Sequence, residues 1–482
     1  MLDPRPILYT LGALICMLAA GMILPLLVDV IAGNKDWEIF MLAMFLTLTI
    51  GGMLMLANQG TGDNLNLRQA FLLTSLTWAI LPAFAALPLA FSELNLSYTD
   101  AYFEAMSGLT TTGSTVISGL DNAPPGLLLW RALLQWFGGI GIIVMAVAVL
   151  PMLQVGGMQV FKAESFDTVE KILPRAGQIS LSISGLYVAF TALCMLFYMI
   201  AGMGMFDALA HSMTTIATGG FSTYDGSIGH FGSYAIDMVT IVFMIVGSIP
   251  FVLFLQILRG KPLAIWRDEQ VRAFTKLTLF LCVSVTLWLV IWKDFSPDEA
   301  FRYGAFNIIS ILTGTGFAST DYSQWGGFSA TLFFFVMFIG GCAGSTSCGI
   351  KIFRFQVLFK SMRSWVNHIV RPNGMFVPTY NKRPITHDVR SSVMAFMSLF
   401  FATFIVLALG VASTGVDWIT AFSSAGTALA NVGPGLGEQV GPAGNFSGLN
   451  DSAKWMMSFG MLIGRLELFS VLVLFSPTFW RG

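Results

Sequence analysis

The chain of 482 residues is 55% hydrophobic and only 11% charged, and its mean hydropathy is +0.76. This composition excludes a soluble globular domain and predicts a polytopic protein whose solvent is the lipid bilayer. The formal net charge of −1 provides no basic surface for nucleic acid, so we expect no nucleic-acid partner.

The five cysteines are scattered mostly through apolar runs and show no CxxC spacing. This pattern favours packing roles over a disulfide framework or a metal site. The five residues are Cys16, Cys194, Cys282, Cys342 and Cys348.

The first predicted elements form a hairpin of two membrane-spanning helices. Apolar runs at 7–32 and 37–57 each have spanning length and are separated by the turn residues 33–36. No A-x-A cleavage site accompanies the first run, so we expect a retained membrane helix and not a signal peptide. Residues 1–60 are therefore predicted to form an N-terminal hairpin outside the rest of the fold.

The next stretch predicts a span, a half-helix and a second span. An apolar run at 67–91 is followed by a helical segment, 99–107, whose rise of roughly 15 Å cannot cross a hydrocarbon core of about 30 Å. We therefore expect this segment to be re-entrant. A hydroxyl-rich stretch that ends at Gly113 follows it, and a span at 127–153 returns across the membrane.

This unit recurs three times, so the sequence predicts an all-α polytopic membrane protein with four helix, pore-helix, helix repeats in a pseudo-fourfold arrangement. The predicted boundaries of the repeats are 61–155, 156–260, 261–370 and 371–482. The later spans are expected at 177–203, 231–258, 273–292, 327–341, 391–412 and 453–475, and the later half-helices at 206–215, 297–312 and 417–430.

A glycine motif follows each half-helix. Glycine allows positive φ, so that successive carbonyls can turn toward one axis, and four such segments can replace the hydration shell of a monovalent cation. The C-terminal ends of the half-helices also favour a cation there. For any single motif a plain helix C-cap is the alternative, and recurrence in register with the topology favours a cation filter. The candidate filter residues are Thr111, Thr112, Gly113, Ala217, Thr218, Gly219, Thr315, Gly316, Asn431, Val432 and Gly433.

The distribution of basic residues predicts the orientation. With these spans, nineteen of the 25 lysines and arginines lie on one face, including the cluster at 351–390 and Lys162, Lys171 and Arg175. By the positive-inside rule this face is cytoplasmic, so both termini are cytoplasmic and all four half-helices enter from outside.

Two features suggest a gate. The second span of the third repeat is interrupted at 340–350 by four glycines, each of which costs about 1 kcal/mol of helix propensity. Arg465 is predicted near the middle of the last span, where an arginine is costly unless it faces protein or water. We expect it to face the pore and to repel cations. The alternatives are a glycine-rich packing face at 340–350 and a structural pair of Arg465 with Glu467.

Several longer motifs resemble one known family. They are Gly108 to Gly113, Gln135 to Val144, Gly219 to Thr223, Gly340 to Thr346, Gly433 to Gly437, Gly464 to Glu467 and Pro477 to Trp480. Together they resemble the TrkH branch of the TrkH/KtrB superfamily of bacterial potassium transporters, which is related in fold to potassium channels. The segments Gly314 to Gly316 and Ser347 to Gly349 depart from that pattern.

The resemblance implies a potassium uptake pore of the cell inner membrane that binds K⁺ at the filter, conducts K⁺ and Rb⁺ with Na⁺ as a further candidate ion, and has no covalent cofactor. In such proteins the loop at 340–350 lies below the filter, which makes Gly344, Ser345 and Thr346 gate residues together with Arg465. It also implies a homodimer and a cytosolic, TrkA-like ring of nucleotide-binding subunits. This chain has no GxGxxG motif after a strand and no P-loop, so any nucleotide control comes through that partner.

Two other functions remain open at this point. A sodium-coupled, KtrB-like potassium transporter shares the four-repeat pattern. A membrane-embedded enzyme is less favoured, because no HExxH motif, no G-x-S-x-G motif at a suitable depth and no intramembrane aspartate pair is present.

Overall fold

The computed structural model describes residues 3–60, 65–148, 176–381 and 383–481. Parts of the expectations above lie outside these residues, namely positions 149–153 of the predicted span and the basic residues Lys162, Lys171, Arg175 and Lys382.

In the described part the chain is almost entirely helical, with one two-stranded antiparallel sheet of β1 (Thr379–Tyr380) and β2 (Arg383–Pro384). Seven helical segments there are long and apolar enough to cross a membrane, and two further helix pairs qualify if each bent pair counts as one span. The prediction of an all-α, multi-pass membrane protein is confirmed.

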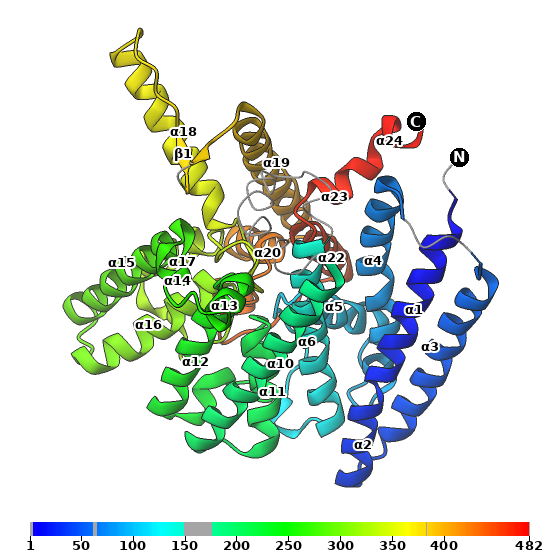
Figure 1. Cartoon of the computed structure of the whole chain (residues 1–482). Coiled ribbons are helices and arrows are strands. Elements are labelled where there is room, and N and C mark those ends of the chain that lie inside the picture. Colours follow the sequence, from blue (N-terminus) through cyan, green and yellow to red (C-terminus); the bar gives the residue numbers. More distant parts are fainter. Residues whose placement is uncertain (1–2, 61–64, 149–175, 382, 482) are drawn as a thin grey trace.

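The N-terminal hairpin consists of α1 (Arg5–Gly21) and α2 (Ile23–Ala32), which together make the first span, and α3 (Trp37–Ala57). It lies at the edge of the molecule beside α4 (Figure 1). The helices pack closely through glycines, since a Cβ at Gly12 would lie 2.7 Å from the Gly51 carbonyl oxygen. Asp29 joins the hairpin to the core by accepting a hydrogen bond of 2.7 Å from the Gly126 N–H.

The rest of the chain repeats one unit four times, as predicted. Each unit has an outer helix, a half-helix and an inner helix. The units are α4 (Leu67–Phe91), α5 (Tyr98–Leu109) and α6 (Pro125–Ala148); α10 (Ala176–Ile200), α11 (Met205–Ile216) and α12 (Tyr234–Gly247) with α13 (Phe251–Leu258); α15 (Glu269–Trp292), α16 (Pro297–Thr313) and α17 (Gly327–Val336); and α19 (His387–Ala412), α20 (Trp418–Ala430) and α22 (Asp451–Arg465) with α23 (Phe469–Leu472).

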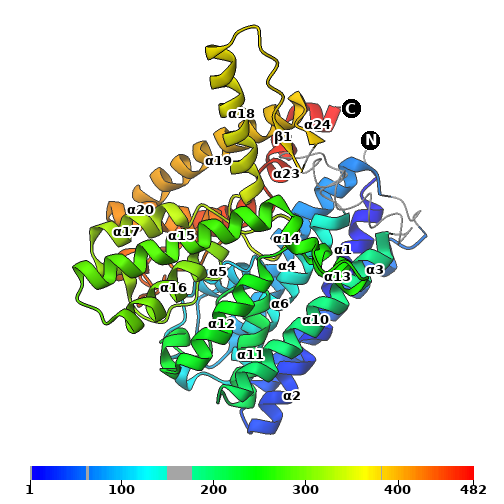
Figure 2. The same ribbon diagram turned by 60° about the vertical axis from the view of Figure 1, so that its left-hand side comes forward.

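The short helix α14 (Ala264–Arg267) and the long helix α18 (Ile352–Val370) connect units. Between the half-helix and the inner helix of a unit lie the 3-10 turns η1 (Leu120–Asn122), η3 (Ser227–Phe231) and η4 (Tyr322–Trp325) and the short helix α21 (Gly437–Val440). The described chain ends with η5 (Val473–Phe475) and α24 (Pro477–Arg481). The long helix α18 projects from the body of the molecule, and both chain ends lie toward the same side (Figures 1 and 2).

The half-helices begin at capping residues and end inside the protein. Side-chain oxygens of Ser97, Ser296 and Asp417 accept hydrogen bonds from the third backbone N–H of their helices, which fixes where three of the four begin. Toward their C-terminal ends these helices are fully buried, as residues 103–109 of α5 show. The half-helices therefore deliver their last turns to the centre of the molecule.

Two predicted continuous spans are wrong, because each is sharply bent. The span at 231–258 bends by 91° between α12 and α13, where Pro250 has no N–H to continue the helix. The span at 453–475 bends by 105° between α22 and α23, where Glu467 and Leu468 adopt positive φ of 55° and 56°. Arg465 is consequently the last residue of α22, not a residue in the middle of a helix.

Candidate cation pore

Four extended segments follow the half-helices and share one backbone pattern. In each, two residues at alternate positions adopt left-handed φ angles: Thr111 (52°) and Gly113 (90°), Thr218 (50°) and Gly220 (81°), Gly314 (72°) and Gly316 (82°), Asn431 (52°) and Gly433 (109°). Left-handed residues at every second position rotate the intervening peptide planes, so that successive carbonyls can point to the same side of the segment.

One recurring hydrogen bond sets the register of the four segments. The N–H groups of Thr112, Gly219, Thr315 and Val432 donate to the carbonyls of Ser107, Thr214, Ser310 and Thr427, at 2.8, 2.9, 2.9 and 3.1 Å. Gly220 therefore occupies the position of Gly113, and Gly219 occupies that of Thr112. Gly219 was expected to be the counterpart of Gly113, which is one residue out of register, and Gly220 was not among the predicted filter residues.

The four segments close into a ring. A Cβ at Gly113 would lie 2.2 Å from the carbonyl oxygen of Gly219, one at Gly220 1.9 Å from that of Thr315, and one at Gly316 2.1 Å from that of Val432. The circle closes at Gly433, where a Cβ would lie 2.9 Å from the Thr112 carbonyl oxygen. Each of these glycines thus leaves space for a carbonyl of the next repeat, in the order one, two, three, four, one.

Side chains reinforce the junction between the fourth and first repeats. Ser114 donates through Oγ to the Gly433 carbonyl at 2.7 Å, and Asn431 donates through Nδ2 to Thr112 Oγ1 at 2.9 Å. These two bonds stabilise the junction at which the distance from the glycine Cβ position to the neighbouring carbonyl oxygen is longest, 2.9 Å at Gly433.

The structure brings all eleven candidate filter residues to this ring or to the turns directly beneath it. The hydroxyls of three of these candidate residues are bonded within the protein. Thr112 and Thr315 Oγ1 lie 2.7 and 2.8 Å from the hydroxyls of Thr110 and Thr313, and Thr218 Oγ1 donates to the Ala217 carbonyl at 2.7 Å. The backbone carbonyls are therefore the better candidate ligands.

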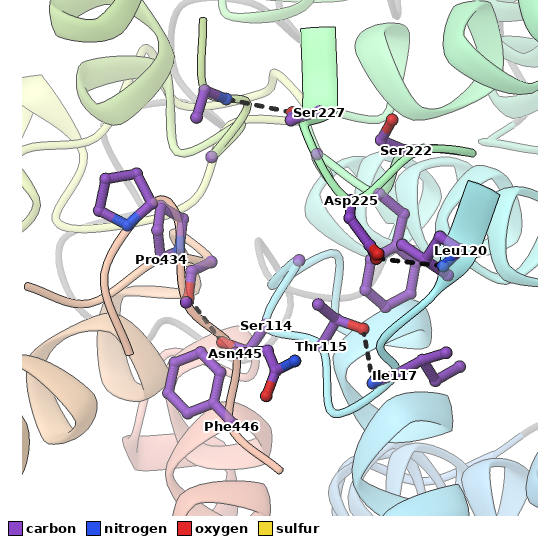
Figure 3. Close-up of a pocket in the computed structure, with 18 of the residues that line it drawn as sticks. Ser114, Thr115, Ile117, Leu120, Ser222, Asp225, Ser227, Pro434, Asn445 and Phe446 are labelled. Carbon is purple, nitrogen blue, oxygen red and sulfur yellow. Dashed lines mark hydrogen bonds between the residues drawn. The ribbon is translucent and has the colours of Figure 1, made fainter. Parts of the chain in front are cut away.

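A polar cavity of about 230 Å³ lies on the side of the ring away from the loop at 340–350 and is bordered by Gly113, Gly220, Gly316 and Gly433. Segments from different repeats converge on it (Figure 3). Its wall is tied together by Asp225, whose carboxylate accepts from the N–H groups of Gly119 and Leu120 at 2.8 and 3.1 Å.

A buried ion pair supports the outer side of the first segment. Glu104 of α5 and Arg131 of α6 are 0% and 2% exposed, and their side chains are 2.8 Å apart. Glu104 also accepts from Thr115 Oγ1 and the Val116 N–H, while Arg131 donates to the Ser222 carbonyl. The pair thus links the exits of the first and second filter segments.

The non-helical residues between α17 and α18 lie beneath the ring. Their two ends are joined by hydrogen bonds of Gly340 N–H to the Ile350 carbonyl and of Ile350 N–H to the Phe338 carbonyl. Thr346 Oγ1 donates to the Ile216 carbonyl at 2.9 Å, and Ser347 Oγ donates to the Thr313 carbonyl at 2.6 Å. The loop, with the candidate gate residues Gly344, Ser345 and Thr346, is therefore fastened to the ends of two half-helices.

Arg465 meets the tip of this loop. It is 4% exposed and donates through Nη1 to Cys348 Sγ at 2.6 Å and through Nη2 to the Gly138 carbonyl at 3.1 Å. Cys348 Sγ also lies 3.4 Å from Thr111 Oγ1 at the lower end of the ring. Cys348 was expected to be a packing residue, because the cysteines show no spacing that indicates a polar role.

The space between loop and ring is small. Cys348, Lys351, Asn431 and Arg465 border a cavity of about 30 Å³, which has room for little more than a water molecule or two. Glu467 borders it as well, but its carboxylate pairs with Arg354 at 2.5 Å. The ion pair of Arg465 with Glu467 that the sequence left open is therefore not formed.

Comparison with known proteins finds close similarity over nearly the whole chain. The model of the TrkH family, described as a cation transport protein, matches residues 37–481. The chain is 44% identical to the Trk system potassium uptake protein TrkI of Halomonas elongata, covering 99% of this chain and 97% of that protein. It is 40% identical to the Trk system potassium uptake protein TrkH of Escherichia coli, covering 99% of each. The crystal structure of the potassium transporter TrkH from Vibrio parahaemolyticus superimposes with a TM-score of 0.93 at 37% identity, covering 100% of both chains.

Proposed function

Since the chain belongs to the TrkH family of cation transport proteins, we propose that it is the potassium-conducting membrane subunit of a Trk-type uptake system. Its relatives are named as potassium uptake proteins, which removes the membrane-embedded enzyme from consideration. The function is transport of K⁺ across a membrane, and K⁺ is the cargo of the pore.

The observation that carries the proposal is the closed ring of glycine and carbonyl contacts. Four carbonyls, those of Thr112, Gly219, Thr315 and Val432, lie at equivalent positions around it. Such a ring replaces the water lost by a cation that enters from the outer cavity. The four half-helices end at the same place, and the negative ends of their dipoles stabilise the bare ion.

The proposed filter comprises the eleven residues named from the sequence together with Gly220. Each repeat supplies one short segment and none has a long glycine-tyrosine signature, so we expect few ion sites and moderate discrimination. K⁺ and Rb⁺ pass, and Na⁺ passes less well.

The loop at 340–350 and Arg465 form the proposed gate. They border the small cavity under the ring, and Arg465 places a cationic group there. Cations cross when the loop and Arg465 move aside. A cytosolic, TrkA-like, nucleotide-binding ring acting on the cytoplasmic side is the proposed source of that movement.

The proposed setting is the bacterial inner membrane, with both termini and α18 on the cytoplasmic side and with two copies of the chain forming a homodimer. The asymmetry of Lys and Arg supports this orientation. We divide the chain into the hairpin 1–60 and the repeats 61–155, 156–260, 261–370 and 371–482.

Flux measurements test the function. The purified protein is reconstituted into liposomes, and uptake is followed with gradients of K⁺, Rb⁺, Na⁺ and Li⁺. We expect uptake of K⁺ and Rb⁺ to exceed that of Na⁺ and Li⁺ without any requirement for sodium. Potassium uptake that depends on a sodium gradient would favour the KtrB-like alternative, and equal or absent flux of all four ions would overturn the proposal.

A further inference from the structure

One side chain from outside the filter segments is bonded to the ring. Gln135 lies on α6, and its side chain is 0% exposed. It donates through Nε2 to the Gly219 carbonyl at 2.6 Å, and its Oε1 accepts from the Phe221 N–H at 3.0 Å. The carboxamide thus holds the second filter segment on both sides of Gly220.

The carboxamide of Gln135 occupies the space that a side chain at position 219 would need. The equivalent positions carry the β-branched residues Thr112, Thr315 and Val432. A Cβ at Gly219 would lie 2.4 Å from both Cδ and Oε1 of Gln135. Gly219 is not among the residues with positive φ, so its backbone does not itself require glycine. The glycine makes room for the carboxamide.

The hydrogen bond makes the second repeat different from the other three. Within the residues that the structure describes, the ring carbonyls of Thr112, Thr315 and Val432 accept no hydrogen bond, whereas that of Gly219 accepts one from Gln135. A donor on a carbonyl competes with a cation for the electron density of the oxygen and lowers the field strength of that ligand. Because Na⁺ holds its water more tightly than K⁺, a weaker field penalises Na⁺ more.

We infer that Gln135 is a specificity-determining positioning residue, which weakens and orients the Gly219 carbonyl and thereby raises the preference of the ring for K⁺ over Na⁺. This inference rests on the proposed function of the ring as a potassium filter. Gln135 acts through Gly219 and is not itself a ligand of the ion.

The first test is Gln135→Met, which keeps the length of the side chain and removes the donor. Initial rates of K⁺ and Na⁺ uptake are measured in liposomes for the wild type and the variant. We expect the ratio of K⁺ to Na⁺ uptake to fall by about threefold or more. Trp136→Phe on the same helix is the matched control, because it removes a partly buried hydrogen bond to Thr191, a residue of α10 and not of a filter segment.

The second test covers the case in which Gln135→Met does not fold. Gly219→Thr alone introduces the clash with Gln135 and should abolish uptake of both ions. The double variant of Gly219→Thr with Gln135→Ala removes the clash and places at position 219 the threonine that the first and third repeats carry. It should recover K⁺ uptake, with a ratio of K⁺ to Na⁺ uptake below that of the wild type.

The outcomes separate the two proposals. Wild-type protein that takes up no K⁺ would overturn the proposed function and this inference together. Normal wild-type uptake with an unchanged K⁺ to Na⁺ ratio in folded Gln135→Met, or in the double variant, would overturn only the inference. Equal losses of K⁺ and Na⁺ uptake would do the same, since they indicate a purely structural role.

Discussion

Arg465 Nη1 lies 2.6 Å from Cys348 Sγ, so the last residue of α22 is bonded to the tip of the loop beneath the filter. The same sulfur lies 3.4 Å from Thr111 Oγ1 in the first filter segment. Loop, arginine and filter are thus in direct contact, and movement of one requires rearrangement of the others. This relationship makes the proposed gate accessible to single substitutions.

Replacement of Arg465 by alanine should raise K⁺ flux. At an effective dielectric constant of about 20, two unit charges about 8 Å apart repel by roughly 2 kcal/mol, which corresponds to an increase of about tenfold or more when the charge is removed. Isotope uptake by proteoliposomes measures the effect. Arg465→Lys keeps the charge and should remain close to the wild type, and unchanged or lower flux through folded Arg465→Ala would refute the gate role.

Replacement of Cys348 by alanine should also raise flux, by about fivefold, the factor that corresponds to about 1 kcal/mol for a lost hydrogen bond. The contact that holds Arg465 to the loop is then absent. Cys342→Ala is the matched control, because this cysteine is equally buried in the same loop and does not border the cavity under the ring. If both variants change flux to the same extent, the Arg465 contact is not what holds the loop.

Gly220→Ala should abolish K⁺ uptake as completely as Gly113→Ala. Both glycines have left-handed φ, and a Cβ at Gly220 would lie 1.9 Å from the Thr315 carbonyl oxygen. Gly415→Ala controls for backbone strain alone, since Gly415 has φ of 94° with nothing within 4 Å of its Cβ position. Strain of that kind costs only about 1–2 kcal/mol. Normal uptake by Gly220→Ala would show that the register of the second segment is wrong.

Glu104→Gln should destabilise the protein by about 3 kcal/mol, because it leaves Arg131 buried without its counter-charge. Thermal unfolding in detergent, followed by loss of monodisperse protein, measures this change. Glu269→Gln removes the partner of Lys360 in an ion pair whose two side chains are 24% and 30% exposed, and should cost less than about 1 kcal/mol. Equal midpoints of thermal unfolding for the two variants would contradict the view that burial makes the Glu104–Arg131 pair costly to break.

The overall fold could be predicted because its determinants are local. Each half-helix is too short to span the bilayer and is followed by a glycine motif, and these features repeat four times. The register of the second segment could not be predicted, because Gly219 and Gly220 are adjacent and either residue can adopt positive φ. In the structure they are distinguished by the hydrogen bond from Gly219 N–H to the Thr214 carbonyl, by the positive φ of Gly220 and by the contact of Gly220 with the third repeat.

The bent spans show a second limit. Pro250 is a sequence signal for a break in the helix. The spans were predicted from apolar runs, however, and the hydropathy of a run does not change when one backbone N–H is missing. The turn at Glu467 and Leu468 contains no glycine or proline, and two residue types that rarely adopt positive φ do so there. The contacts of Cys348 could not be predicted either, since those with Arg465 and Thr111 join segments more than a hundred residues apart.

Because one polypeptide supplies all four quadrants of the ring, the quadrants are free to differ. A channel built from four identical subunits places every substitution at four positions at once, so that a small change in one carbonyl is multiplied by symmetry. Here a single codon alters one of the four segments of the proposed filter. Ion preference can therefore change in small steps during evolution. The glycine at position 219, whose three counterparts are β-branched, is an asymmetry of this kind.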